Sequence, residues 1–334
     1  MSINNERLNI YEHLLNPYEH FSNPYENLWI YYIEGTPKKD LLAPLFNRNS
    51  SENGNGFIGN WEEDGFSFLF FSSASDEIVQ NIVEQDKNLT LIDTYQMSGE
   101  MWHGDKIESY SSGNLCISPP WKIPFVNQPG IKHILLDPGV VFGTGRHPTT
   151  EDCLRYIEYI CSLETQTFNS KNNVSSDLEY TNDSTDIISS ADRVDKKTIS
   201  TVLDIGTGTG LLAVAAAVLG CEKVVAVDFN LLAVKTAQNN IRLNSLEDRV
   251  LAVQGRAEDF ISIPADLVVA NIHYDVMRHL LEIPQFFEHK WLVLSGLLKS
   301  EVNLVLNSLK NRNIVVVETS SPDGVWNTIL AKCK

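Results

Sequence analysis

The segment that decides the fold is Val202-Leu203-Asp204-Ile205-Gly206-Thr207-Gly208-Thr209-Gly210. It begins as an apolar run typical of a buried strand, and its closely spaced glycines precede a helix predicted over 211–219. Glycines let the backbone turn sharply and approach a ligand closely, and the free amides of a helix N-terminus can bind that ligand. The segment therefore predicts a ligand-binding loop between a strand and a helix.

Strands and helices alternate from residue 200 onward, with a second helix predicted over 231–244. Such alternation is typical of a doubly wound parallel sheet. The last two apolar runs flank a turn at 321–324 and predict an antiparallel hairpin that closes the sheet. We expect an α/β fold with a seven-stranded Rossmann-like sheet, whose strands are 201–205, 223–228, 249–254, 267–270, 291–295, 313–318 and 325–333.

An acidic residue stands at the end of the second of these strands, in Val224-Val225-Ala226-Val227-Asp228. A carboxylate in this place can accept hydrogen bonds from ribose hydroxyls. Enzymes that bind dinucleotides share this plan, but their fingerprint needs a glycine at the sixth position, where Leu211 stands. The spacing, Asp204 near the end of the first strand and the terminal hairpin favour S-adenosylmethionine as the ligand. Glycines that only shape a turn are the third explanation.

The fourth strand leads into Asn271-Ile272-His273-Tyr274. Ligands of open α/β sheets bind beyond the carboxyl ends of the strands. Asn271 could present its side-chain oxygen to a substrate N–H or hold the amino-acid end of the cofactor. Tyr274 could offer an aromatic face to an amine, and His273 is the nearby candidate base. The alternatives are structural, namely a turn cap for Asn271 and loop packing for His273 and Tyr274.

Further motifs precede the sheet, and all occur in the order seen in one family. The motifs are Asp137-Pro138-Gly139, Phe142-Gly143-Thr144-Gly145, His147-Pro148-Thr149-Thr150, the glycine loop, Asp228, Asn271 and Leu294-Ser295-Gly296-Leu297-Leu298. By these motifs the chain resembles the ribosomal protein L11 methyltransferases over roughly residues 130–334, without 164–198, and faintly upstream to Trp102.

This resemblance implies a methyltransferase that uses S-adenosylmethionine to methylate lysine ε-amines, or an N-terminal α-amine, of a ribosomal protein. It places the 142–145 loop over the methionine end of the cofactor, although a plain hinge loop is the alternative. The catalytic residues expected are Asn271, His273 and Tyr274. The cofactor-binding residues expected are Phe142, Thr144, Thr150, Asp204, Gly206, Gly208, Asp228 and Asn271.

One departure from the family leaves more than one candidate for the nitrogen that accepts the methyl group. The family usually continues the Asn with small aliphatic residues, whereas His273 and Tyr274 follow Asn271 here. This arrangement is closer to the Asn-Pro-Pro-Tyr pattern of enzymes that methylate planar nitrogens, although both prolines are missing. A small-molecule amine or another protein nitrogen is therefore the alternative substrate.

The chain is expected to divide into an N-terminal domain over 1–118, a linker over 119–148 and a catalytic domain over 149–334. The resemblance implies that the smaller N-terminal α+β domain is ferredoxin-like and recognises the substrate. Within the catalytic domain, a helix over 149–163 precedes a polar insertion at 164–198, which has too few apolar residues to form a core. The N-terminal domain's predicted elements are strands 28–33, 65–71 and 114–118, helix 75–85, and helix starts in the near-repeats at 16–20 and 23–27.

The charge balance limits the partners. Lys and Arg number 26 against 43 Asp and Glu, for a formal net charge of -17, which argues against general nucleic-acid binding and suits a basic partner. The longest apolar run, 211–219, is far short of a membrane span, and the N-terminus lacks the pattern of a secretory signal. The five scattered cysteines suggest no metal site. We expect a cytoplasmic monomer that binds a ribosomal protein free of RNA, with no direct nucleic-acid, membrane or metal contact.

Overall fold

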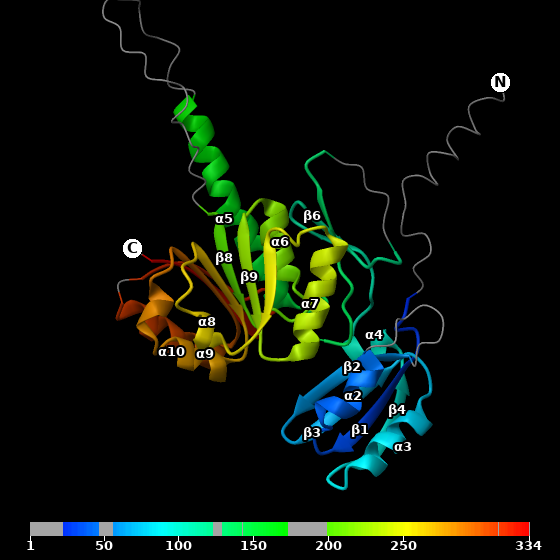
Figure 1. The fold of residues 1–334 in the computed structure, drawn as a ribbon. Helices are drawn as coiled ribbons and strands as arrows, with labels where there is room; N and C mark the ends of the chain where they lie inside the picture. The colour runs from blue at the N-terminus through cyan, green and yellow to red at the C-terminus, as the bar shows by residue number, and fades with distance from the viewer. Residues whose placement is uncertain are drawn as a thin grey trace, which may run out of the picture. The chain divides into compact units, whose positions relative to one another are not determined.

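The computed structural model describes residues 23–46, 56–122, 129–141, 143–172, 199–312 and 314–333 (Figure 1). The polar segment beyond residue 172 and the near-repeat at 16–20 lie outside these ranges. Among the described residues, no helix is both long and apolar enough to cross a membrane.

The C-terminal half contains the predicted mixed sheet of seven strands, in the order β10-β9-β8-β11-β12-β14-β13. Strand β14 pairs antiparallel with both neighbours, whereas β8, β9, β11 and β12 pair in parallel, so the α/β prediction is confirmed. The strands are β8 (Thr201–Ile205), β9 (Lys223–Asp228), β10 (Val250–Gln254), β11 (Leu267–Asn271), β12 (Trp291–Leu298), β13 (Val315–Ser320) and β14 (Trp326–Lys332).

Both faces of the central strands β8, β11 and β12 are buried, as their near-continuous apolar sequences require. Alternate residues such as Leu203, Val268 and Leu292 belong to a core that also contains residues of α8 (Ala257–Phe260), α9 (Tyr274–Leu280) and α10 (Lys299–Lys310). These three helices lie together in Figure 1. Helix α5 (Pro148–Asn172) contacts β11, β12 and β14. The other helical elements are α6 (Leu211–Leu219), α7 (Leu231–Leu243) and the 3-10 turn η1 (Pro284–Phe287).

Helix α5 is longer than predicted. The prediction that it ends at residue 163 is wrong, because the helix continues to Asn172. Residues 164–172 are polar but contain no glycine or proline, so no residue that breaks a helix stands there. The first part of the expected polar insertion is therefore helical.

The N-terminal sheet has four antiparallel strands in the order β2-β3-β1-β4. The chain order β1-α2-β2-β3-α3-β4 with this strand order is the ferredoxin-like arrangement that the resemblance implied. Strands β2 and β4 and helix α2 were not predicted from the sequence. The elements are β1 (Leu28–Glu34), α2 (Lys39–Phe46), β2 (Phe57–Glu63), β3 (Phe66–Phe71), α3 (Asp76–Gln85) and β4 (Thr90–Met97).

A third, small sheet follows in the chain, and its strands have the order β5-β6-β7. Strand β7 falls within the segment assigned to the linker and pairs in parallel with β6. The helix start expected at 23–27 is wrong, because this stretch forms turns in which the Tyr25 amide donates to Asn23 Oδ1 over 2.9 Å. The elements here are α4 (Gly99–His103), β5 (Tyr110–Ser112), β6 (Leu115–Ser118) and β7 (Lys132–Leu135).

Candidate cofactor and substrate site

The glycine loop follows β8 and is tied to the end of β9. The amides of Gly206 and Thr207 both donate to the carbonyl of Val227, over 2.8 and 3.0 Å. Gly206 has a φ of 70°, in the left-handed region that favours glycine. A Cβ built on Gly206 would also collide with the side chain of Ile272. Both the backbone conformation and the lack of space therefore require glycine at the start of the loop.

The Asp228 carboxylate accepts hydrogen bonds from backbone amides of the glycine loop and of its own turn. Its Oδ2 accepts from the Gly208 amide over 3.0 Å, and its Oδ1 accepts from the Asn230 amide over 2.9 Å. Burial raises the pKa of this carboxyl above its ordinary value, although amides of Asn230, Gly208 and Phe229 oppose that rise. A carboxylate oxygen can accept more than one hydrogen bond, so Asp228 can hold the loop and also accept from ribose hydroxyls.

Asp204, the other predicted carboxylate, lies at the core of the loop. It is buried, and its Oδ2 accepts from the hydroxyl of Thr207 over 2.6 Å. The Thr207 hydroxyl therefore links the glycine loop to β8, the strand that precedes the loop. This contact gives Asp204 a structural reason to stand near the strand end, beside any contact that it makes with a cofactor.

Two predicted residues from distant motifs meet at the start of α5. The side-chain amide of Asn271, at the end of β11, donates to the hydroxyl of Thr150 over 3.4 Å. The Thr150 amide donates to the His147 carbonyl over 2.8 Å, which fixes the first turn of α5. Because the Asn271 amide nitrogen donates to Thr150, its Oδ1 is the side-chain atom that could accept from a substrate or cofactor N–H.

A pair of buried hydroxyls lies beside this turn, and the sequence did not point to its second member. Ser295 lies in the 294–298 motif, where the β12–β14 register shifts between Leu294 and Leu297. The hydroxyls of Ser295 and Thr328 lie 2.6 Å apart, and Ser295 also donates to the Thr149 carbonyl over 3.4 Å. A hydroxyl residue within the apolar run of β14 was the available signal for Thr328.

His273 and Tyr274 lie at the beginning of α9, directly after Asn271 in the chain. His273 is the N-cap residue, but its side chain makes no capping hydrogen bond, and it is exposed. Tyr274 is partly buried and packs against the core of the large sheet. Packing against the core therefore explains most of the burial of Tyr274, whereas the exposed His273 is accessible as a candidate base.

The loop upstream of α5 is described except for Phe142, which lies outside the described residues. The carbonyl of Gly143 accepts from the Thr209 hydroxyl over 2.8 Å, and the carbonyl of Thr144 accepts from the Tyr110 hydroxyl over 3.4 Å. Two motifs that the sequence separates, the 142–145 loop and the glycine loop, are thus joined by a side-chain hydrogen bond.

Phe229, directly after Asp228, was not predicted from the sequence as a site residue. Phe229 is 70% exposed although it is a large apolar side chain. An aromatic ring beside a carboxylate that suits ribose can stack on a flat base such as adenine. An aromatic residue directly after the acidic strand end was the signal in the sequence. No group of three or more His, Cys, Asp and Glu side chains in the described ranges could hold a metal ion.

Known proteins were compared with the chain. The sequence model of the family described as ribosomal protein L11 methyltransferase (PrmA) matches residues 66–334. A protein of that name from Alkaliphilus oremlandii is 31% identical over 249 residues, which cover 73% of this chain and 68% of the relative. One from Streptococcus pneumoniae (strain JJA) is 30% identical over 221 residues, which cover 66% of this chain and 58% of the relative, somewhat less than two thirds of its length.

A solved structure supports the fold. The ribosomal protein L11 methylase of Lactobacillus delbrueckii subsp. bulgaricus matches with a TM-score of 0.50 at 23% identity, over 68% of this chain and 99% of that one. The motifs that suggested a family include the glycine loop, Thr150 and Asn271. The chain belongs to the ribosomal protein L11 methyltransferase family.

Proposed function

We propose that this protein transfers methyl groups from S-adenosylmethionine to lysine amines of ribosomal protein L11. The observation that carries the proposal is the glycine loop, whose amides meet the end of β9 and Asp228. The positive φ of Gly206 requires glycine at the start of this loop, and a glycine backbone lets a cofactor approach closely. The relatives are named ribosomal protein L11 methyltransferase.

The residues divide the cofactor between them. Asp228 accepts from the ribose hydroxyls, Gly206 and Gly208 allow close approach to the backbone, and Phe229 stacks on the adenine. Thr150 and Asn271 hold the methionine end, and Phe142 and Thr144 close over it. Asp204 supports the loop through Thr207. When bound, S-adenosylmethionine supplies an electrophilic methyl group.

The chain orients a neutral amine and shields it from water. A lysine ammonium has no lone pair and an ordinary pKa of about 10.4, so the amine must lose its proton before it reacts. Burial of the amine lowers its pKa. Asn271 Oδ1 accepts an N–H of the amine and fixes its direction, Tyr274 lies beside it, and the exposed imidazole of His273 takes the proton. Holding two reactants in line supplies most of the acceleration.

The proposed organisation follows the same division of labour. Residues 1–118 recognise the substrate, 119–148 link the domains, and 149–334 carry the chemistry. We expect a cytoplasmic monomer that meets the ribosomal protein before assembly and free of RNA, because a net charge of -17 repels RNA phosphates. No direct contact with nucleic acid or membrane is part of this proposal.

The test is methylation of purified ribosomal protein L11 by the purified protein, followed by mass spectrometry. With the wild type, the mass of L11 should increase by the mass of one or more methyl groups. Asp228→Ala should neither methylate L11 nor bind S-adenosylmethionine in calorimetry. Asp275→Ala is the matched control, because this carboxylate is exposed in the first turn of α9. A wild type that binds the cofactor but leaves L11 unmodified would contradict the substrate.

The second candidate is methylation of a small-molecule amine or another protein nitrogen, and His273-Tyr274 after Asn271 favours it. Ribosomal proteins from cells with and without the gene separate the two. If the methylation of L11 is the same in both, the second candidate is supported.

A further inference from the structure

Two cysteines that lie 60 positions apart in the sequence contact each other in the C-terminal half of the chain. Cys161 is in α5, and Cys221 lies between α6 and β9. Their Sγ atoms are 4.0 Å apart, and both residues are reduced thiols. The proposed methyl transfer uses neither side chain. The pair is therefore a reactive feature outside the residues assigned to the cofactor and the substrate.

The end of helix α6 fixes the backbone of Cys221. Gly220 has a φ of 112°, in the left-handed region that favours glycine, and its amide donates to the Ala217 carbonyl over 2.9 Å. The Cys221 amide donates to the Ala216 carbonyl over 3.0 Å. These two hydrogen bonds are those of a Schellman motif, which ends a helix in one defined conformation. Cys221 therefore has a well-defined position although it follows the helix.

Helix α5 holds the backbone of Cys161, which lies within its regular span Pro148–Asn172. A disulfide needs an S–S distance of about 2.05 Å, so the two sulfurs must approach each other by about 2 Å. Rotation of a cysteine side chain between its staggered rotamers moves the sulfur on this scale. The two thiols can therefore form a bond while both elements keep their backbone conformation.

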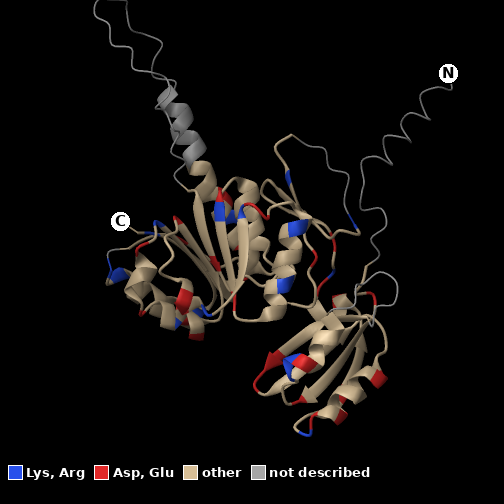
Figure 2. Ribbon diagram, in the orientation of Figure 1, with Lys and Arg blue, Asp and Glu red and all other residues tan. Residues whose placement is uncertain are grey.

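The two cysteines differ in exposure, and this difference gives them different roles. Cys161 is partly exposed, whereas Cys221 is fully buried. The exposed residues Glu222 and Lys223 follow Cys221, and Figure 2 shows charged residues of both signs where β9 begins, so the pair lies close beneath the surface. A small oxidant in solution therefore meets Cys161 first, and Cys221 reacts with the oxidised Cys161.

We propose that Cys161 and Cys221 form a modification site at which hydrogen peroxide converts two thiols into a reversible disulfide. The Cys161 thiolate attacks one oxygen of the peroxide, so that an S–O bond forms and the O–O bond breaks. The hydroxide that leaves takes up the proton that the thiol had lost and becomes water. The Cys221 thiolate then attacks the Cys161 sulfur and displaces the hydroxyl group as a second water. The two thiols lose two electrons and two protons in total, and the peroxide takes up both.

The bond connects α5 to the turn after α6 and encloses residues 162–220, which include the glycine loop. Closing so long a loop restricts the unfolded chain, so the disulfide should stabilise the fold. In the cytoplasm, where we propose that the protein acts, a disulfide is transient and redox-sensing rather than structural. A dithiol reductant reopens it by thiol–disulfide exchange. The site thus goes beyond methyl transfer and adds a response to peroxide.

The main experiment treats the purified full chain with hydrogen peroxide, blocks the remaining thiols with N-ethylmaleimide under denaturing conditions, and digests the product with trypsin without reductant. Trypsin should release Cys161 in residues 156–171 and Cys221 in residues 198–223. We expect mass spectrometry to find these two peptides joined, with two hydrogens fewer than their sum, and to find them separate after dithiothreitol. If both peptides of the peroxide-treated wild type carry maleimide or separate oxygen atoms instead, the proposal is overturned.

Three variants test the roles of the two residues. Cys161→Ser and Cys221→Ala should give no joined peptide, and Cys333→Ser is the control, because it removes another partly exposed thiol outside the pair. In Cys221→Ala the sulfenic acid of Cys161 should accumulate and be labelled by dimedone, whereas Cys161→Ser should show no such label on Cys221. Labelling of Cys221 in Cys161→Ser would overturn the proposed order of attack.

Thermal unfolding shows whether the bond forms in the folded protein. The Tm of the peroxide-treated wild type should exceed that of the same sample after dithiothreitol by about 4–10 °C, and Cys161→Ser should show no such difference. A joined peptide without a rise in Tm would mean that the bond forms only in unfolded chains, and the modification site would then be wrong.

Discussion

The side-chain amide of Asn271 donates to the hydroxyl of Thr150 over 3.4 Å, although the two residues are 121 positions apart. Asn271 ends β11, and Thr150 lies in the first turn of α5. The contact brings together a motif of the catalytic sheet and a motif that precedes it. It also engages the side-chain nitrogen of Asn271, so that the oxygen is the atom left for the proposed contact with an amine.

The first prediction concerns that orientation. Asn271→Ala should lower kcat about tenfold to a hundredfold, because the amine loses the acceptor that directs it. Thr150→Val should lower kcat less, and Thr150→Ser should restore most of it, since serine keeps the hydroxyl. Steady-state kinetics with calorimetric cofactor affinity provide the measurement. Unchanged turnover and affinity in Asn271→Ala would remove Asn271 from the site.

The second prediction uses two glycines with almost the same backbone conformation. Gly206 has a φ of 70° and Gly104 a φ of 69°, so alanine is strained to a similar degree at both. A Cβ at Gly206 would collide with Ile272, whereas a Cβ at Gly104 would meet nothing within 4 Å. Gly206→Ala should therefore abolish cofactor binding and lower the free energy of unfolding by about 2–4 kcal/mol, more than Gly104→Ala.

Chemical denaturation and calorimetry of both variants test this. The Gly104→Ala protein should bind S-adenosylmethionine as the wild type does and lose only about 1 kcal/mol of stability. Equal losses of stability in the two variants would mean that the contact with Ile272 relaxes easily and that glycine is not needed there for space.

Elements whose strands are buried on both faces were predictable from the sequence. Strands β8 and β9 and helix α6 begin and end where predicted, because each has a mostly apolar sequence close to glycines or polar residues. Strand β4 was missed because most of its side chains are exposed and show no alternation. The local pattern carries information only where one face is buried.

The candidate site divides in a similar way. Gly206 and Asp228 are identified by a local motif, because the loop needs special backbone geometry and the carboxylate follows a strand at fixed spacing. The Ser295–Thr328 contact is set by a register shift between β12 and β14, which no local pattern encodes. Phe142 lies outside the described residues, so its role stays a prediction.

The third prediction concerns the buried hydrogen bond between Tyr25 and Asp137. The Tyr25 hydroxyl donates to Asp137 Oδ1 over 2.8 Å, and burial raises the pKa of the Asp137 carboxyl. Tyr25→Phe removes a donor from a buried carboxylate and should cost about 1–3 kcal/mol of stability in urea denaturation. Tyr159→Phe is the control, because Tyr159 is 42% exposed. A loss no greater than the control's would show that the Gly139 amide, which also donates to Asp137 Oδ1 over 2.9 Å, is sufficient for this carboxylate.

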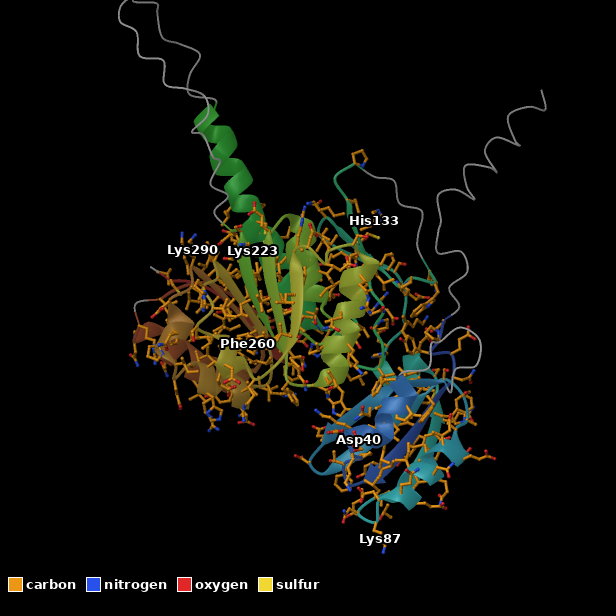
Figure 3. The ribbon with its side chains drawn as sticks, in the orientation of Figure 1. Asp40, Lys87, His133, Lys223, Phe260 and Lys290 are labelled. Carbon is orange, nitrogen blue, oxygen red and sulfur yellow. The ribbon has the colours of Figure 1, made fainter. Side chains whose placement is uncertain are left out.

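The fourth prediction concerns the end of the large sheet at which its parallel strands begin, where Lys223 and Lys290 lie (Figure 3). Asp266 Oδ1 pairs with Lys290 Nζ at 2.6 Å, and its Oδ2 accepts from the Ser200 and Thr201 amides over 2.8 and 3.0 Å. Partial burial opposes ionisation of Asp266, but these hydrogen bonds outweigh it and lower the pKa of the carboxyl below its usual value.

Because the pKa of Asp266 is lower in the folded state, its stabilising effect is present above the unfolded value of about 3.9 and is lost as the pH falls through the folded value. Asp266→Asn should therefore lose about 1–3 kcal/mol at pH 7, and its difference from the wild type should vanish in acid. Lys290 is 56% exposed, so Lys290→Met should lose at most about 1 kcal/mol. Urea denaturation at several pH values tests both variants. Equal losses of stability in Asp266→Asn and Lys290→Met would mean that the ion pair, rather than the hydrogen bonds to Ser200 and Thr201, stabilises this end of the sheet.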